Sequence, residues 1–447
     1  MDYDLIINKY KDQGMKILKD LVAIPSVLDE YKPESSEPFG KYNKEALDYI
    51  LNKGEEFGFK TKNVDNYAGH IEYGSGKEIL GILAHLDVVP VTKEEWDQDP
   101  FLLTIKDNKM YGRGTTDDKG PLVASLIAMK ILKDEGYKPN KKIRLIMGCD
   151  EESGSRCLER YLEKEDKPDL AFSPDADFPL IYGEKGILSY DIVGYEDSII
   201  TEMYAGERYN IVPSMAYFKL SINKEREFKE FLERKNYKGE IKDGKYIIYG
   251  ESSHAMDPDK GINAIYLMFE FLFQYTDSKL AEFVYKYYLF DNHGKKADYY
   301  DYDDEMKDLT SNLAIIRLEN QKFKLGFNVR CPKDDSFDVI PEKVSKIAGI
   351  YRYRFEFLGG SKRHYVNRNT ELVQKLLKAY QEITNDYSEP ITIGGGTYAR
   401  ELGYAVAFGP QMPGRPDVCH ISNEYMRLED FFNAIKIYYL AIKELTK

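Results

Sequence analysis

Histidine and carboxylate side chains occur at several points of the sequence in combinations that could bind metal ions. They are His85, Asp87, Asp117, Glu151, Glu152 and Asp175. Imidazole and carboxylate ligands together suit zinc, manganese or cobalt. Carboxylates gathered in a poorly solvated cleft repel one another at a cost of several kcal/mol unless protons or cations neutralise them. Several carboxylates with only one or two histidines therefore favour two divalent ions that share a bridging carboxylate.

Each of these groups has a simpler explanation when it is taken alone. A histidine at the end of a strand is usually structural, a Glu-Glu pair usually lies on the surface, and the Asp-Asp-Lys-Gly sequence at 117–120 is typical of a turn. The argument for a common site is their placement, because each group follows a predicted strand or opens a predicted helix.

Short apolar runs precede most of these side chains and predict buried strands. The runs cover residues 79–84, 143–147, 170–172 and 405–408. Between the first two runs, apolar residues from Pro121 to Leu132 recur at three- and four-residue spacing, which predicts a helix with the proline in its first turn. Strands that alternate with helices predict an α/β domain with a mostly parallel, doubly covered sheet.

A parallel sheet would bring the candidate side chains together. His85, Glu152 and Asp175 each follow a predicted strand, and ligands of an open parallel sheet bind beyond the carboxyl ends of its strands. The sequence therefore predicts these three side chains at one rim of the sheet, with Asp117 on a loop beside them.

The middle third of the chain has a different pattern. From residue 187 to residue 364 the apolar residues alternate more and the loops are longer, and an amphipathic helix near Thr370 marks the return of α/β character. The simplest organisation is a discontinuous α/β domain, residues 1–186 and 365–447, interrupted by an inserted domain at 187–364.

The composition excludes several classes of protein. The length of 447 residues suggests two domains. The net charge of −13 argues against a nucleic-acid partner and against an anionic membrane surface. The 4 cysteines form no CxxC pair, so neither a disulfide scaffold nor a thiolate zinc site is expected. Charged residues interrupt the first twelve positions, and no apolar run approaches about 18 residues, so a cytoplasmic protein is expected.

The motifs, in their order along the chain, resemble those of a family of co-catalytic di-zinc metallopeptidases. This family includes PepV-type bacterial dipeptidases, carnosinase, aminoacylase and succinyl-diaminopimelate desuccinylase. Its patterns H-x-D-x-V-P, G-R-G-x-x-D-D-K-G-P and D-E-E-S-G correspond to residues 85–90, 112–121 and 150–154, with further matches at 394–400 and 420–424. Segments 174–179, 184–186, 210–213 and 253–258 are most similar to the PepV-type dipeptidases.

The resemblance implies a zinc-exopeptidase-like catalytic domain and a metal site of five ligands. His85 and Asp175 would bind one ion, Glu152 and His420 the other, and Asp117 would bridge both. The implied cofactors are two divalent ions, zinc first, with manganese or cobalt as alternatives. The family also implies a cis peptide bond between Asp117 and Asp118.

The resemblance further implies the catalytic roles around these ligands. Glu151 would act as general base on a metal-bridging water, and Asp87 would orient the imidazole of His85. In the inserted α+β lid domain, His254 would stabilise the oxyanion of the transition state.

Three residues are implied in substrate binding. Asn210 would contact the substrate, and the guanidinium of Arg330 would bind its C-terminal carboxylate. Gly395, within the glycines at 394–396, would let the backbone approach the substrate. Two simpler alternatives remain, a surface arginine at 330 and a plain turn at the glycines.

The resemblance implies a metallo-dipeptidase that hydrolyses unblocked dipeptides and so supplies amino acids. A monomer is expected, because the enlarged insert of PepV-type enzymes replaces the partner subunit of smaller relatives. One alternative is an N-acyl-amino-acid deacylase or succinyl-diaminopimelate desuccinylase with the same metal site. An alternative of another class is a non-catalytic binding protein of the same fold.

Overall fold

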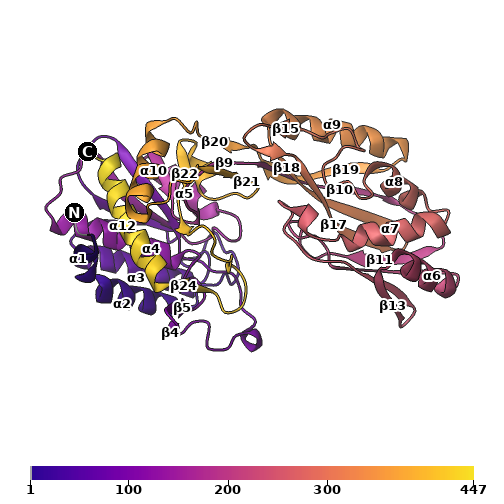
Figure 1. Cartoon of the computed structure of the whole chain (residues 1–447), viewed down its shortest axis with the longest axis horizontal. Coiled ribbons are helices and arrows are strands. Elements are labelled where there is room, and N and C mark those ends of the chain that lie inside the picture. The colour runs from indigo at the N-terminus through magenta and orange to yellow at the C-terminus, as the bar shows by residue number, and fades with distance from the viewer. Residues whose placement is uncertain (1–2) are drawn as a thin grey trace. The chain divides into compact units, whose positions relative to one another are not determined.

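The computed structural model describes residues 3–447, which divide into two compact units (Figure 1). Unit 1 comprises the chain up to Gly183 together with Tyr365–Ile391 and Gly396–Lys447, and unit 2 comprises Glu184–His364 and Thr392–Gly395. The division lies three residues before the expected boundary at 186/187 and coincides with the one at 364/365.

One short segment departs from the expected division. Residues 392–395 were expected in the catalytic domain but group with unit 2. The backbone N–H of Lys185 donates to the carbonyl oxygen of Ile393 (2.9 Å), and the hydroxyl of Thr392 donates to the carbonyl oxygen of Glu305 (2.8 Å). These long-range hydrogen bonds tie the segment to unit 2.

A nine-stranded sheet runs through unit 1 in the order β1-β2-β6-β3-β7-β22-β9-β20, with β21 beside β9. Its centre is parallel and consists of β6 (Lys142–Gly148), β3 (Ile79–His85), β7 (Leu170–Ser173) and β22 (Ala405–Ala407). The predicted mostly parallel sheet is confirmed there. The margins are antiparallel, where β1 (Lys60–Val64), β2 (Ala68–Tyr73) and β9 (Ile181–Glu184) pair.

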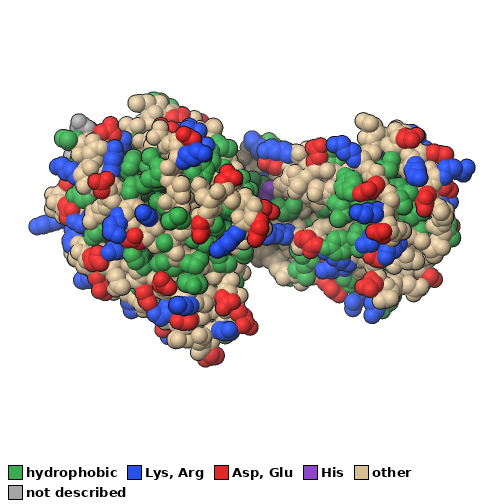
Figure 2. All heavy atoms as spheres, turned by 90° about the horizontal axis from the view of Figure 1, so that it is seen from below, with side chains coloured by type: hydrophobic (Ala, Val, Ile, Leu, Met, Phe, Trp, Pro, Cys, Tyr) green, Lys and Arg blue, Asp and Glu red, His purple; other side chains and the backbone are tan. Residues whose placement is uncertain are grey.

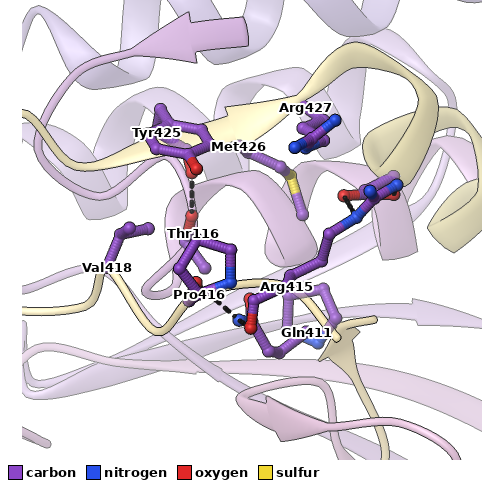
Figure 3. Close-up of a pocket in the computed structure, with 10 residues that line it drawn as sticks. Thr116, Gln411, Arg415, Pro416, Val418, Tyr425, Met426 and Arg427 are labelled. Carbon is purple, nitrogen blue, oxygen red and sulfur yellow. Dashed lines mark hydrogen bonds and ion pairs between the residues drawn. The ribbon is translucent and has the colours of Figure 1, made fainter. Parts of the chain in front are cut away.

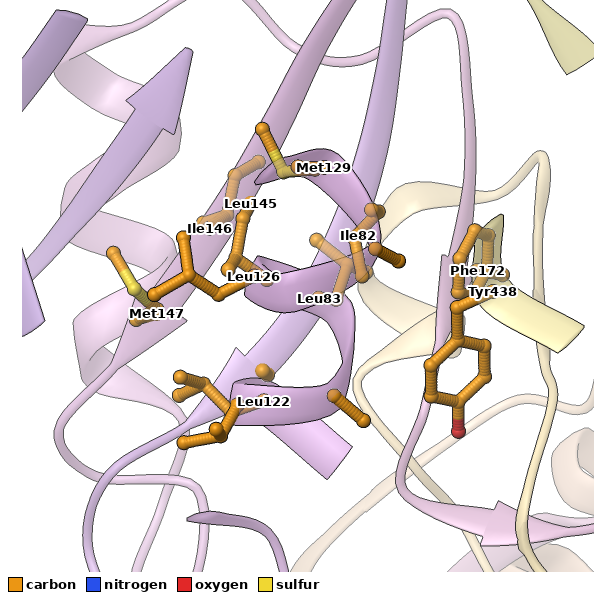
Figure 4. Close-up of a cluster of buried hydrophobic side chains, with 14 of the residues drawn as sticks. Ile82, Leu83, Leu122, Leu126, Met129, Leu145, Ile146, Met147, Phe172 and Tyr438 are labelled. Atoms are coloured by element: carbon orange, nitrogen blue, oxygen red, sulfur yellow. The ribbon is translucent and has the colours of Figure 1, made fainter. Parts of the chain in front are cut away.

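Helix α4 (Lys119–Asp134) packs on β3 and β6 and also contacts α2 (Lys11–Val22) and α12 (Leu428–Leu445). Its Leu122, Leu126 and Met129 follow the three- and four-residue spacing and are fully buried. Figure 4 shows them beside Ile82 and Leu145 of the two strands. The predicted helix is confirmed, and it anchors the loop before it to the core.

Unit 2 is built on an eight-stranded antiparallel sheet in the order β13-β14-β12-β11-β17-β18-β10-β19. Its helices α6 (Glu225–Lys235), α7 (Ala264–Tyr275), α8 (Lys279–Tyr287) and α9 (Asp334–Ile350) contribute to a core separate from that of unit 1. The strands are β10 (Gly186–Tyr195), β11 (Ile200–Ala205), β12 (Met215–Leu220), β13 (Lys238–Lys242), β14 (Lys245–Tyr249), β17 (Thr310–Glu319), β18 (Lys322–Cys331) and β19 (Arg354–Ser361). The predicted α+β character is confirmed.

The remaining helices and strands complete the two units. They are α1 (Tyr3–Asn8), α3 (Lys41–Glu56), α5 (Arg156–Lys164), α10 (Glu371–Thr384), α11 (Ala399–Leu402), β4 (Thr104–Lys106), β5 (Lys109–Tyr111), β8 (Ala176–Asp177), β15 (Tyr302–Asp303), β16 (Lys307–Asp308), β20 (His364–Tyr365), β21 (Ile391–Ile393), β23 (Pro410–Gln411) and β24 (Tyr425–Arg427). Two 3-10 turns cover Lys93–Glu95 and Pro258–Lys260. Between residues 3 and 447, none of the helices has the length and hydropathy needed to cross a bilayer.

The surface carries both signs of charge. In the view of Figure 2, acidic and basic side chains alternate over each unit, and no basic stripe of the kind that binds nucleic acid crosses this face.

Candidate metal centre

The candidate ligands lie just beyond the carboxyl ends of the parallel strands. His85 is the last residue of β3, Glu152 follows β6, and Asp175 follows β7. Asp117 stands two residues before α4, and His420 lies in the loop before β24. Because β6, β3 and β7 are parallel neighbours, their carboxyl ends meet at one rim. The sheet therefore positions three ligands, and two loops add the others.

The structure gathers these five side chains into two groups that share Asp117. In the first group, Nε2 of His85 lies 2.9 Å from Oδ1 of Asp117 and 3.5 Å from Oδ2 of Asp175. In the second, Nε2 of His420 lies 2.8 Å from Oδ2 of Asp117 and 3.0 Å from Oε1 of Glu152. The two oxygens of Asp117 thus face different groups, as a bridging carboxylate requires.

The atoms of the first group fit a divalent cation. Nδ1 of His85 lies 2.9 Å from the carbonyl oxygen of Asp87, which can only accept a hydrogen bond, so this contact places the ring hydrogen on Nδ1. Nε2 then presents a lone pair. Among the described residues, neither this buried Nε2 nor the buried Oδ1 of Asp117 has a hydrogen bond, although they face each other. Two electron-rich atoms so placed are suitable metal ligands.

The electrostatics of the second group also call for positive charge. Burial opposes ionisation of Asp117, but the adjacent imidazoles of His420 and His85 outweigh it and hold the pKa of this carboxyl well below its usual range. Burial and the charge of Asp117 raise the pKa of Glu152 to about 7. Burial alone would lower the pKa of His420, yet Asp117 and Glu152 raise it to about 11. Protons on the imidazoles, or divalent cations in their place, supply this positive charge.

Asp87 holds both the first ligand and the segment that carries the predicted base. Besides its carbonyl contact to His85, its Oδ1 lies 3.5 Å from Nδ1 of the same ring. Its two carboxylate oxygens accept the backbone N–H groups of Glu151 and Glu152, each at 3.1 Å. The imidazole is thus oriented mainly by the backbone of Asp87, and the Asp87 carboxylate fixes residues 151 and 152.

Glu151 lies beside the ligands without belonging to either group. Burial raises the pKa of its carboxyl well above the usual range; the charge of His85 opposes this rise, and the charges of Asp175 and Glu152 add to it. A carboxylate with a raised pKa suits a group that accepts a proton near neutral pH. This environment is suitable for the predicted general base.

One contact of the site was missed in the sequence. Asp118 is fully buried, and its Oδ2 accepts the backbone N–H of His85 at 3.0 Å. The Asp117–Asp118 peptide bond is cis, as the resemblance implied. The adjacent acidic pair was a visible signal, but it did not reveal which carboxylate faces the ligands and which holds the strand.

The remaining predicted residues lie in unit 2, where two loops are joined. Ile211 and His254 form an antiparallel bridge, and the N–H of Ala255 donates to the carbonyl oxygen of Asn210 at 2.8 Å. The buried amide of Asn312 donates to the carbonyl oxygens of Tyr209 (3.2 Å) and Ile211 (2.9 Å). Asn210 and His254 therefore lie on two loops that backbone hydrogen bonds join to each other.

Arg330 is buried in β18 with only 4% of its surface exposed. Its Nε donates to Oδ1 of Asn328 (2.8 Å), and one Nη donates to the carbonyl oxygen of Gly394 (2.9 Å). The surface-arginine alternative is therefore wrong. A Cβ at Gly394 would meet Cβ of Met256 at 2.6 Å, whereas one at Gly395 would make only an ordinary contact at 3.5 Å. The close packing thus requires glycine at 394 rather than at 395.

Comparisons of the sequence with known proteins identify the family of the chain. The model of peptidase family M20/M25/M40 matches residues 81–444. A protein of Staphylococcus haemolyticus named "Putative dipeptidase" is 37% identical over 461 aligned positions that cover 98% of each chain.

Two solved structures share the fold. Human carnosine dipeptidase 1 has a TM-score of 0.62 at 17% identity and covers 99% of this chain and 98% of its own. A dinuclear metal-binding peptidase of the M20 family from Bacillus subtilis has a TM-score of 0.50 at 12% identity, with 98% of each chain covered. The chain therefore belongs to the peptidase family M20/M25/M40 and is a peptide-bond hydrolase.

Proposed function

We propose that this protein is a metal-dependent dipeptidase that hydrolyses unblocked dipeptides. The observation that carries the proposal is the pair of ligand groups that share Asp117, with Glu151 beside them. The name of the staphylococcal relative and that of human carnosine dipeptidase 1 support the choice of dipeptides over other substrates.

The two groups of donor atoms support a specific set of metal ligands. His85, Asp117 and Asp175 would hold one ion, and Asp117, Glu152 and His420 the second. Zinc is the first candidate for both positions, with manganese or cobalt as alternatives. When bound, the ions lower the pKa of a water molecule and polarise the scissile carbonyl.

The protein side chains would move the proton. Glu151 accepts a proton from the attacking water as the water oxygen bonds to the carbonyl carbon, and delivers it to the leaving amine as the C–N bond breaks. The backbone N–H of Glu151 donates a hydrogen bond to Asp87, which fixes the backbone that carries the Glu151 carboxylate. His254 is proposed to donate a hydrogen bond to the carbonyl oxygen as negative charge develops on it.

Substrate selection is proposed to depend on unit 2. Arg330 would pair with the free C-terminal carboxylate, for which a guanidinium is the suitable partner. Asn210 lies on a loop that is fixed by hydrogen bonds from Ala255 and Asn312, and it would contact the substrate backbone.

A substrate panel tests the proposal directly. The purified protein, loaded with zinc, manganese or cobalt, is given free dipeptides, the same dipeptides with acetylated N-termini, and N-acetyl and N-succinyl amino acids. We expect amino-acid release from the free dipeptides alone. Release only from acylated amino acids would establish the deacylase alternative, and no hydrolysis by metal-loaded protein would establish the binding protein.

A further inference from the structure

Another buried carboxylate, that of Glu424, accepts hydrogen bonds from the loop that carries Asp117. Its side chain is fully buried. Oε1 accepts the backbone N–H groups of Thr116 (2.8 Å) and Asp117 (3.3 Å). Oε2 accepts the backbone N–H of Gly114 (3.1 Å) and Nη1 of Arg113 (2.7 Å). All four donors lie within residues 113–117, which we call the bridging loop.

Further hydrogen bonds join the bridging loop to the segment around Glu424. The N–H of Gly112, just before the loop, donates to the carbonyl oxygen of Glu424 at 3.0 Å. The hydroxyl of Thr116 donates to the carbonyl oxygen of Tyr425 at 2.9 Å, as Figure 3 shows. The cavity beside this contact has a volume of only about 20 Å³. It is too small to hold a dipeptide, so this cavity is not a substrate pocket.

A carboxylate is the side chain that this loop needs. The backbone N–H groups of Gly114, Thr116 and Asp117 lie outside regular structure, and buried N–H groups without partners are costly. Glu424 supplies two acceptor oxygens at one point, and Arg113 balances its charge. The hydrogen bonds to Glu424 therefore fix the backbone of this loop, which has no strand or helix hydrogen bonds to do so.

Glu424 also connects the bridging loop to the other histidine of the site. His420 lies four residues before it, and both precede β24. The second ligand group combines Asp117 with His420, whose facing atoms lie 2.8 Å apart. A single side chain therefore ties together the two loops that supply these ligands.

We propose that Glu424 is a positioning residue that sets the spacing between Asp117 and His420, and so the affinity for the ion held by the second group. This inference rests on the proposed metal centre. It goes beyond the ligands and the base, because Glu424 contacts the bridging ligand only through the backbone N–H of Asp117.

The test is Glu424→Gln, which keeps the shape of the side chain. An amide has one acceptor oxygen, so one pair of N–H donors would face an NH₂ group instead. We expect the affinity for one of the two zinc ions, the one held by the second group, to fall about 10- to 100-fold in a competition with a chelator. At saturating zinc we expect KM to stay near that of the wild type and kcat to fall. The absorption spectrum of the cobalt-loaded variant should also change, since the ligand geometry changes.

Asp430→Asn is the matched control. Asp430 is also a buried carboxylate paired with an arginine, because Nε and Nη2 of Arg415 each lie 3.1 Å from its oxygens. It makes no hydrogen bond to the bridging loop among the described contacts. Its loss should lower the melting temperature but leave zinc affinity and the cobalt spectrum unchanged.

The outcomes separate the inference from the proposed function. Wild-type affinity and an unchanged cobalt spectrum in Glu424→Gln would overturn the positioning role, even if stability fell. A wild-type protein that binds no second ion would overturn the metal centre itself. If Glu424→Gln does not fold, Glu424→Asp decides, because it keeps the charge but shortens the reach of the carboxylate to its four donors. That variant should weaken zinc binding about two- to fivefold, and unchanged binding would refute the inference.

Discussion

Two adjacent glutamates of the site are distinguished by what surrounds them. Glu152 lies 3.0 Å from His420 and belongs to a ligand group, whereas Glu151 belongs to neither group. Both backbone N–H groups are held by Asp87. We therefore propose different roles for these two neighbours, ligand for Glu152 and base for Glu151, because the fixed backbone directs them to different partners.

Glu151→Gln tests the role of the base. The substitution keeps the shape and leaves both ligand groups intact, so the protein should bind the same number of metal ions as the wild type. Turnover should fall about 10²- to 10⁴-fold, because the amide cannot accept the proton. Metal content and kcat are measured on the same preparation. Glu152→Gln is the control and should lose metal. Turnover at the wild-type rate in Glu151→Gln would show that Glu151 is not the general base.

His254→Ala tests the role of the histidine in unit 2. If its ring hydrogen-bonds the developing oxyanion, kcat should fall about 10²- to 10³-fold at unchanged metal content. The loop should persist, because the bond from Ala255 to Asn210 and the bridge to Ile211 use backbone atoms. Loss of metal in this variant would instead place His254 among the ligands.

At the scale of elements, helix α4 links the core to the metal site. The loop with Asp117 leads directly into this helix, and the helix packs on the two strands that precede His85 and Glu152. Rigid packing of α4 therefore fixes three ligands relative to one another.

Leu126→Ala measures how much this packing contributes. Leu126 is fully buried between α4 and the sheet, so its truncation should lower the free energy of unfolding by about 2–5 kcal/mol. Leu126→Met, which keeps the volume, should cost less than about 1.5 kcal/mol. Both are measured by urea unfolding of the metal-loaded protein. Equal stabilities of the two variants would contradict the packing described for this residue.

At the scale of the whole molecule, the −13 net charge includes carboxylates gathered at one site. Metal binding should therefore stabilise the folded chain, since ligands that bind only the folded state shift the unfolding equilibrium. At zinc concentrations about 100-fold above the dissociation constant, the gain is about 2.7 kcal/mol.

Metal removal tests this coupling. Chelator treatment should lower the melting temperature in calorimetry, and zinc should restore it. Asp117→Asn, which weakens the shared ligand, is the control in which zinc should raise the melting temperature much less. A melting temperature that changes with neither chelator nor zinc would contradict a metal centre in the folded protein.

The expected monomer is tested by mass. Unit 2 has a hydrophobic core of its own, and we expect the chain to be a monomer. Light scattering should give the chain mass of 51.8 kDa across the concentrations used for activity. Twice this mass would show a dimer and would contradict the expectation.

The sequence by itself determined the parallel centre of the sheet and helix α4, whereas the proposed ligand set, His420 included, came from the resemblance of its motifs to those of a known family. The sheet and the helix were predictable for a simple reason. These follow from local patterns, because apolar runs and helical spacing report burial directly. The antiparallel margins and the assignment of residues 392–395 to unit 2 were not predictable in this way. They depend on hydrogen bonds such as that from Lys185 to Ile393, which link segments far apart in the chain.

Only the tertiary structure decided how the ligands are held. Glu424 reaches its four donors across 307 to 311 positions of sequence, and no local pattern encodes such a contact. The same holds for Arg330. The alternation of apolar residues placed it on a strand, but its burial depends on a long-range contact with residue 394. Residue types determine what chemistry is available, whereas distant backbone contacts determine the distances at which it can act.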